Sequence, residues 1–600
     1  MTALNKLICT GTIISFILTC GLNAEENLPE IESLSLNPSE IQLGSPFANA
    51  QVIATAKLMS GDSIDATRLA KVTIEGDSAK INESAFVEPV KNGNSIINFE
   101  FQGKTVSLSV KVEGQANEFK PDYVRDIMPV ISRMGCNGGT CHGSRTGKNG
   151  FKLSLRGYDP IYDIRAFTDD LGGRRVNVAA PDSSLLLLKA TGAVPHEGGQ
   201  VTKINSDYYN IVKSWISGGA KLNLSSPKVK GIEVFPKNPV VQKIGQKQQI
   251  RVVATYNDGI KRDVTKEAFV QSGNTEVAEP EKESHSLINT IRRGEAPILI
   301  RYEGNYTATT VTVMGDRSEF VWQQPSANNK IDELVASKWE RMKILPSGLC
   351  DDYEFVRRAY LDITGLPPSA QVIQEFVSDK TNQKQKRDAL IDRLIGSEEY
   401  TDHWTNKWAD LLQVNRKFLG QEGAKGLRQW IRMQVQNNKP YDQFVREIIT
   451  ATGSNKTNPA ASYFKILREP VSMMENTTHL FLATRFNCNK CHDHPFERWT
   501  QDQYYELAAY FAQVDLKRDP ASGKSNIGGT AVEGAKPLYE LISDKKEGEV
   551  IHDRTKEVSA PSFPYSAGRD SAKQKKETRR AELADWITAP GNQYFSSSYV

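Results

Sequence analysis

The chain has 600 residues, with 75 Lys and Arg side chains against 72 Asp and Glu, which gives a formal net charge of +3. A chain of this length exceeds what one core usually holds, and a hydrophobic fraction of 39% is enough for several cores, so we expect a multidomain protein. The near balance of charge gives no reason to expect nucleic acid or an anionic membrane surface as a partner.

The N-terminal segment has the pattern of an export signal. Lys6 is followed by an apolar run from Leu7 to Leu22 and by Ala24. This run is short and polar for a spanning helix, so we predict a signal peptide over residues 1–24 and no transmembrane helix after its removal. The expected location is extracytoplasmic, in the periplasm or at the cell surface. Lipoprotein anchoring through Cys20 is a minor alternative, because Thr19 fits the small-residue preference before such a cysteine poorly.

Residues 28–115 and 230–315 each predict a small all-β sandwich, because short alternating apolar runs are separated by Gly, Asn and Asp turns. Val52–Ala56 and Val252–Tyr256 are nearly the same in sequence, which indicates two copies of one module. With Asp263-Val264-Thr265, both stretches resemble bacterial immunoglobulin-like domains of group 2. This resemblance implies Ig-like modules that space other domains apart or bind a cell-surface polymer, and it implies no catalysis.

Between the sandwiches, residues 119–225 predict helices, one over residues 123–134 that Pro129 interrupts and one beginning at Ser206. The run Gly135-Cys-Asn-Gly-Gly-Thr-Cys-His-Gly143, with the segments 181–185 and 215–220, resembles the planctomycete cytochrome C domain family. This resemblance implies a small all-α cytochrome c-like domain. In such a domain Cys136 and Cys141 would form thioethers to haem and His142 would bind the iron.

The longer spacing between these cysteines departs from the usual motif, but Gly138 and Gly139 tolerate the backbone angles that a longer loop needs. His196 occupies the place where a distal methionine often lies in such domains, so it is the candidate sixth ligand. The alternative is a Cys136–Cys141 disulfide with His196 as a surface residue.

Residues 330–519 predict a larger, mainly α-helical domain. Its segment Phe355–Pro368 closely resembles the start of a planctomycete-type domain of unknown function that is paired with that cytochrome domain in large surface proteins. Ser472 with Glu475 and Thr500 with Gln503 are predicted capping boxes of two of its helices.

The same domain carries a second motif, Cys488-Asn-Lys-Cys491-His492, which is the attachment signature for c-type haem. A structural zinc site is the alternative, because Cys488, Cys491, His492 and His494 supply four suitable donors. A distal ligand cannot be chosen among Met473, Met474, His479 and His403. Asp493 and Glu497 are candidates to orient a ligand by hydrogen bonding to its ring.

Residues 520–578 predict a flexible polar segment, and residues 579–600 resemble the start of a following domain of unknown function that the chain cuts short. The proposed architecture is two all-β sandwiches that alternate with a small all-α and a larger mainly α-helical domain.

The motifs together predict an exported c-type cytochrome-like protein that binds two covalent haems and passes electrons to redox partner proteins. No G-x-S-x-G or H-E-x-x-H motif is found, so no catalytic residues are predicted. Two alternatives stay open. One is a cell-surface scaffold or adhesion protein whose Cys/His motifs bind a structural metal, and the other is haem-dependent oxidation of an extracytoplasmic substrate.

Overall fold

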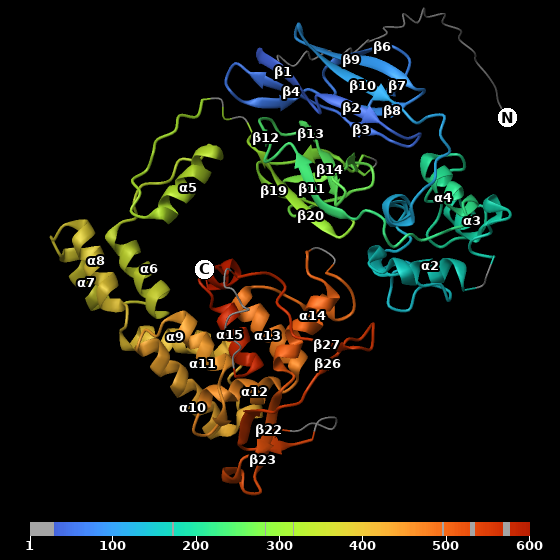
Figure 1. Cartoon of the computed structure of the whole chain (residues 1–600). Helices are drawn as coiled ribbons and strands as arrows, with labels where there is room; N and C mark the ends of the chain where they lie inside the picture. Colours follow the sequence, from blue (N-terminus) through green and yellow to red (C-terminus); the bar gives the residue numbers. More distant parts are fainter. Residues whose placement is uncertain are drawn as a thin grey trace, which may run out of the picture.

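The computed structural model describes residues 29–170, 173–282, 284–315, 317, 319–494, 497–528, 534–567 and 577–599. The predicted signal peptide and Cys20 lie outside these residues. The chain is multidomain, with a β-rich N-terminal region that a small helical unit interrupts and with a mainly helical C-terminal part. Figure 1 shows the two sandwiches in blue and green, the small helical unit in teal, and the C-terminal part from yellow to red.

The first sandwich buries alternate residues of its long strands. On β9 (Gly93–Phe101), Ile97, Phe99 and Phe101 are buried while the residues between them are exposed or half-buried, which is the two-residue period of a strand. Its sheets have the orders β1-β4-β5, β2-β10-β9-β6 and β3-β8-β7. The other strands are β1 (Ile31–Asn37), β2 (Glu40–Leu43), β3 (Ala50–Gln51), β4 (Ile53–Leu58), β5 (Ser63–Asp65), β6 (Lys71–Glu75), β7 (Ala79–Ile81), β8 (Phe86–Pro89) and β10 (Lys104–Val112).

The second sandwich repeats the first strand by strand, with sheets β11-β14-β15, β12-β20-β19-β16 and β13-β18-β17. The predicted duplication is therefore confirmed, but its register is not the one expected. β14 starts 198 residues after β4, so Ile53 corresponds to Arg251. The alignment of Val52 with Val252 that the sequence suggests is therefore shifted by two residues from the structural one. Its strands are β11 (Val229–Phe235), β12 (Val240–Val241), β13 (Lys247–Gln249), β14 (Arg251–Tyr256), β15 (Lys261–Asp263), β16 (Phe269–Ser272), β17 (Ala278–Pro280), β18 (Leu287–Thr290), β19 (Gly294–Tyr302) and β20 (Asn305–Val313).

The two sandwiches alternate with helical units along the sequence but pack directly against each other in space (Figure 1). The Gln249 N–H donates to Asp65, and the Gln51 N–H donates to Asp263 over 3.1 Å. Asp65 and Asp263 occupy equivalent positions, as do Gln51 and Gln249, so the same contact occurs twice with the modules exchanged. This is the self-complementary interface of a pseudo-two-fold pair.

The small helical unit has a core formed by Tyr123, Phe167 and Trp215 among others. It contains a π-helical turn (Tyr123–Ile127), α1 (Met128–Arg133), a 3₁₀ turn (Leu155–Gly157), α2 (Pro160–Thr168), a 3₁₀ turn (Pro181–Ser183), α3 (Leu185–Ala190) and α4 (Asp207–Ser217). Residues 123–133 form one helical run, and its hydrogen-bond pattern changes from the π-helical turn to α1 directly before Pro129, where the sequence predicts an interruption. The unit docks on the second sandwich, where Arg262 donates to Asp126 over 2.9 Å.

The C-terminal part has two separate cores. Val356, Phe376, Leu390 and Leu394 form a small one, and the later helices form the large one. Its helices are α5 (Lys330–Arg341), α6 (Asp352–Thr364), α7 (Ala370–Ser378), α8 (Gln383–Leu394), α9 (Glu398–Leu411), α10 (Arg416–Gln436), α11 (Tyr441–Ile449), α12 (Ser462–Leu467), α13 (Pro470–Leu482), α14 (Gln501–Ala508), α15 (Arg579–Ile587) and α16 (Gln593–Tyr599). In the described part of the chain, no helix has the length and apolar character needed to cross a membrane.

Residues 520–578 do not form the flexible polar segment expected from their composition, as far as they are described. They contribute β23 (Asn526–Ile527), β24 (Lys536–Pro537), β25 (Glu540–Asp544), β26 (Val550–Ile551) and β27 (Val558–Ser559). β25 pairs with β21 (Gly453–Ser454) and β22 (Val514–Arg518). Glu540 is buried because it pairs with Lys465 at 3.0 Å, a partner that lies 75 residues away in sequence.

The C-terminal helices were expected to begin a separate domain, and the structure corrects this expectation. Leu583, Trp586 and Ile587 of α15 and Phe595 of α16 are buried in the large core of the preceding helices. Their apolar faces complete that core, so residues 579–599 belong to the same folded unit as α9 to α14.

Candidate functional site

The first motif lies in a tight loop that follows α1. The Cys136 N–H donates to the Ile131 carbonyl over 3.1 Å, and the His142 N–H donates to the Cys136 carbonyl over 3.1 Å. Gly143 closes this loop against the Asn137 carbonyl, which a Cβ at Gly143 would approach to 2.1 Å. The loop therefore returns on itself and brings His142 back to the first cysteine.

The His142 ring is held by its Nδ1 atom. Nδ1 lies 3.0 Å from the Phe151 carbonyl oxygen, and the ring packs on the Phe151 ring with centroids 4.6 Å apart. A carbonyl oxygen can only accept, so Nδ1 carries the proton and Nε2 keeps a lone pair in the neutral ring. Burial lowers the pKa of His142 below its usual value, which favours this neutral form. An imidazole in this state can bind a metal through Nε2.

The thiol of Cys136 faces the core of the small helical unit. Burial, together with the nearby Cys141, raises the pKa of Cys136 to about 12. Neither cysteine of this motif is in a disulfide. A thiol that stays protonated is a poor zinc ligand, because zinc binds the thiolate.

His196 is half-buried, and its Nδ1 lies 2.9 Å from the Gly199 carbonyl oxygen. Its Nε2 is therefore also left with a lone pair when the ring is neutral. The charge of His196 contributes to lowering the pKa of His142, after the larger effect of burial, so the two rings lie within electrostatic range of each other.

The second motif is presented at the surface by a 3₁₀ turn (Asn487–Lys490). Cys488 lies in this turn and Cys491 directly follows it, and both are exposed free thiols. Between them, Asn489 is fully buried and donates from Nδ2 to the Trp499 carbonyl over 2.6 Å. The turn is thus anchored by its middle residue while both thiols face outward.

His492 repeats the arrangement of His142. Its Nδ1 lies 2.7 Å from the Asp493 carbonyl oxygen, so Nε2 is left as the ligand atom. The carboxylates considered for this orienting role make other bonds. The Asp493 Oδ1 accepts the Gln501 N–H over 2.8 Å, and Glu497 accepts the Trp499 Nε1–H over 2.7 Å.

The donors proposed for zinc do not converge. Within the described ranges, no three His, Cys, Asp or Glu side chains are grouped so that they could hold a metal ion. The distal ligand of the second motif is not identified either. Met473 and Met474 are buried in the large core, and the Nε2 of His479 accepts from Arg485 over 3.2 Å.

One hydrogen-bonded group beside the second motif was not found from the sequence. Tyr504 donates to Glu475 over 2.7 Å, and Asn487 donates to the other oxygen of Glu475 over 3.2 Å. The predicted capping box at Thr500 and Gln503 is confirmed and places Tyr504 on the first turns of α14. The expected role of Glu475 as a helix cap is wrong, because α13 already begins at Pro470.

The two motifs lie on either side of one junction. From the second sandwich, Tyr306 donates to the His494 carbonyl over 2.9 Å, two residues beyond His492. From the small helical unit, the Arg156 N–H donates to the Asn137 carbonyl inside the first motif over 3.0 Å. Arg156, Tyr306 and His494 all line one cavity of about 280 Å³. The junction therefore joins the small helical unit, the second sandwich and the C-terminal part.

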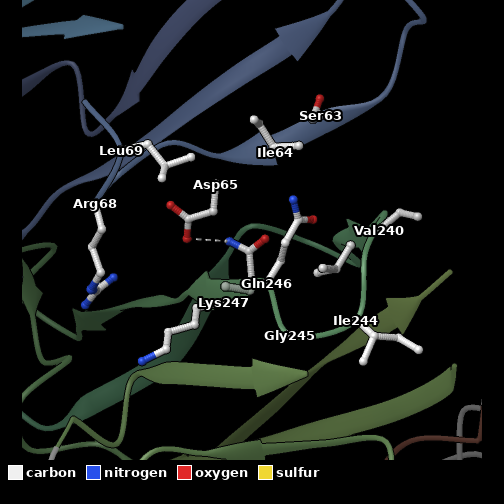
Figure 2. A pocket seen from close by; sticks show the side chains of 12 residues that line it. Ser63, Ile64, Asp65, Arg68, Leu69, Val240, Ile244, Gly245, Gln246 and Lys247 are labelled. Atoms are coloured by element: carbon white, nitrogen blue, oxygen red, sulfur yellow. Dashed lines mark hydrogen bonds between the residues drawn. The ribbon is translucent and has the colours of Figure 1, made fainter. Parts of the chain in front are cut away.

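A larger cavity of about 410 Å³ lies between the two sandwiches, away from both motifs. Figure 2 shows Asp65 of the first sandwich directed toward the second, with Arg68 and Lys247 at one side. Asp65 accepts from Gln248 Nε2 over 3.3 Å and from the Thr67 N–H over 2.8 Å. Its carboxylate serves the pairing of the modules.

Comparison with protein families identifies one part of the chain. Residues 330–516 match the family model PSCyt2, described as "Protein of unknown function (DUF1549)". This match fits the planctomycete-type domain of unknown function expected over 330–519. It includes the Cys488 motif. The comparison with curated proteins gave no match.

Among solved structures, domains 1–6 of the surface layer protein SbsC match with 13% identity and a TM-score of 0.14, over 48% of this chain and 28% of that one. Domains 5–6 of the same S-layer protein match with 10% identity and a TM-score of 0.21, over 48% of this chain and 100% of that one. Extracellular domains 3–5 of Drosophila OTK match with 7% identity and a TM-score of 0.11, over 48% of this chain and 63% of that one. The chain thus spans less than a third of the length of SbsC domains 1–6.

Proposed function

We propose that this chain is an extracytoplasmic electron-transfer protein that binds haem c covalently at two motifs, through Cys136 and Cys141 and through Cys488 and Cys491. The observation that carries the proposal is the shared state of His142 and His492. Each donates its Nδ1–H to a backbone carbonyl beside its motif, which leaves Nε2 to bind iron. Histidines that only filled space in a core or on a surface would have no reason to adopt this tautomer at both motifs.

The residues of the second motif fit the group. Both thiols are exposed at one short turn, the buried side chain of Asn489 fixes that turn, and the carbonyl of Asp493 fixes the His492 tautomer. Such a hydrogen bond orients the ring of a ligating histidine and raises its basicity. When bound, haem supplies an iron centre that gains and loses one electron.

The first motif fits in its donor set and differs in exposure. Cys141 and His142 are half-buried, and the Cys136 thiol faces the core. His196 is the candidate for the opposite side of the iron, because its Nε2 is also available and it lies within electrostatic range of His142. Two imidazole ligands would give this site a lower reduction potential than an imidazole with a thioether.

The placement of the motifs on one junction supports transfer between them, since both are tied by hydrogen bonds to the residues that line it. Redox partner proteins would supply and remove the electrons. The Ig-like modules would fix the position of the junction, and a cell-surface polymer is their candidate partner.

The deciding experiment is pyridine haemochrome quantification of the full chain, exported from a host with cytochrome c maturation genes. We expect about two haems per chain, falling to about one in Cys491→Ala and in Cys141→Ala. Cys350→Ala is the matched control, because Cys350 is a free cysteine outside both motifs. A colourless protein that retains zinc would refute electron transfer and support the scaffold alternative.

A further inference from the structure

The cavity at the junction is lined by charged groups from three separate parts of the chain. The small helical unit contributes Arg156, the second sandwich contributes Arg301 and Glu303, and the C-terminal part contributes Asp493. Lys228, in the connection before β11, also lines it. Neither haem motif contributes a thiol or a ligating imidazole to its wall, so a function of this cavity does not depend on haem.

The β19–β20 hairpin delivers Arg301 to this cavity. Glu303 and Gly304 form its turn with φ of 46° and 71°, and this turn type sets Arg301 directly opposite Tyr306. The guanidinium lies 4.3 Å from the centroid of the Phe269 ring. Among the described residues, no carboxylate lies within ion-pair distance of it. Arg301 is therefore a half-buried cation that lies over an aromatic ring and has no carboxylate partner at ion-pair distance among the described residues.

Arg156 reaches the same cavity from a strained backbone. Its φ is 59°, which is uncommon for a residue with a side chain and costs on the order of 1 kcal/mol. The bond from its N–H to the Asn137 carbonyl holds it there, and a Cβ at the next residue, Gly157, would approach Met128 to 2.6 Å. Burial, followed by the charge of Arg156, lowers the pKa of Arg301 to about 10, so the two cations repel each other across the cavity.

The charges of the lining do not cancel. Arg156, Arg301 and Lys228 carry three positive charges, whereas Glu303 and Asp493 carry two negative charges even when both are ionised. Burial raises the pKa of Glu303 to about 8, which leaves it mostly protonated at neutral pH. Its Oε2 is buried with no hydrogen-bond partner among the described residues. A protonated Glu303 could donate a hydrogen bond into the cavity.

We propose that this cavity binds a small oxyanion, the phosphate or carboxylate group of a small molecule, between the guanidinium groups of Arg156 and Arg301. Two guanidinium groups match the oxygens of such an anion in charge and in geometry. The volume of about 280 Å³ is at the low end for small-molecule sites, which fits an inorganic phosphate or a short dicarboxylate better than a nucleotide. A bound anion would touch residues of all three parts of the chain.

The test is isothermal titration calorimetry of inorganic phosphate, and separately of succinate, into the full chain in a zwitterionic buffer. We expect one saturable site per chain for at least one of the two probes. Binding by phosphate alone would identify a phosphate group as the natural ligand group, and binding by succinate alone would identify a carboxylate. Arg301→Gln should weaken that binding at least tenfold, because a hydrogen-bonded charge contact is lost. Arg301→Lys should weaken it less, since it keeps the charge and loses the bidentate geometry.

Lys247→Gln is the matched control, because Lys247 lines the other cavity (Figure 2) and the change removes the same charge. We expect Lys247→Gln to bind the probe as tightly as the unsubstituted chain does. Arg301→Gln and Lys247→Gln should both unfold at the same temperature as that chain. The proposal is overturned if neither probe binds saturably at millimolar concentration, or if Arg301→Gln and Arg301→Lys both bind as tightly as Lys247→Gln.

Discussion

Replacing Asp163 with alanine should loosen the segment that holds the first motif. The Asp163 carboxyl is buried, with an exposed fraction of 2%, and accepts the Ser154 N–H over 2.5 Å and the Ser154 hydroxyl over 2.7 Å. The neighbouring Leu153 N–H donates to the His142 carbonyl over 2.8 Å. One carboxyl thus holds Ser154 in place, and Ser154 is next to the residue that binds the His142 backbone.

The magnitude follows from the groups left behind. In Asp163→Ala the buried N–H and hydroxyl of Ser154 lose their acceptors, at about 1–3 kcal/mol each, so we expect about 2–6 kcal/mol of local destabilisation. Asp163→Asn keeps an oxygen for the N–H and offers an amide donor to the hydroxyl oxygen. We expect that variant to lose less than about 1 kcal/mol.

The same carboxyl predicts a pH dependence. Burial raises the pKa of Asp163 to about 7 from 3.8, against the opposing effect of the Ser154 hydrogen bonds. The folded chain then binds more protons than the unfolded chain between these values. This contribution to stability is therefore fully present below about pH 4 and is lost as pH rises to about 7, at up to about 1.4 kcal/mol per pH unit. Asp163→Asn should remove this dependence.

The assay is amide hydrogen exchange of the full chain, followed by mass spectrometry on peptides covering residues 150–157 and corrected for intrinsic exchange at each pH. Peptides from β9 and β10 serve as an internal control, because they belong to the first sandwich. Equal protection in Asp163→Ala and Asp163→Asn would refute the hydrogen-bond argument. Protection in the unsubstituted chain that rises between pH 4 and 7 would refute the titration argument.

Two further predictions concern the contacts between domains. Asp65→Ala should raise the hydrogen-exchange rate of the Gln249 amide at least tenfold, because this amide loses its acceptor. Asp263→Ala is the control and should leave Gln249 protected, because Asp263 accepts from Gln51 instead. Equal effects of the two variants on Gln249 would contradict the pairing. Arg262→Ala should destabilise docking of the small helical unit by about 1–3 kcal/mol, because it removes an ion-pair partner of the buried Asp126. The measurement is amide hydrogen exchange over residues 122–127, which should become faster. No increase there would show that other contacts carry the docking.

The sequence predicts local elements of this chain well because their signals are local. Alternating apolar residues mark the sandwich strands, and the capping box at Thr500 marks the start of α14. The box at Ser472 failed although its pattern is equally good. Pro470 already starts that helix, since proline is suited to the first turn, and Ser472 is left inside it.

Contacts between residues that are distant in sequence could not be predicted from the sequence. Glu540 lies in a segment whose charges predict mobility, but in the structure it is buried and pairs with Lys465 and Arg468, which lie far away in sequence. For the motifs, the cysteines and histidines could be named from their spacing, whereas the backbone acceptors could not. The carbonyls of Phe151 and Asp493 carry no residue-specific signal, yet they fix the tautomers of His142 and His492.

The junction connects the two proposals through charge. The cavity lining is positive in sum, and it is tied to the first motif by Arg156 and to the second by Tyr306. A positive group near a redox centre favours its reduced form, because the added electron is attracted to it, and this attraction is stronger in a partly buried site than in water. An oxyanion held by Arg156 and Arg301 would offset that charge. If both proposals hold, the bound anion should therefore lower the reduction potential of the centre closer to the cavity more than that of the other.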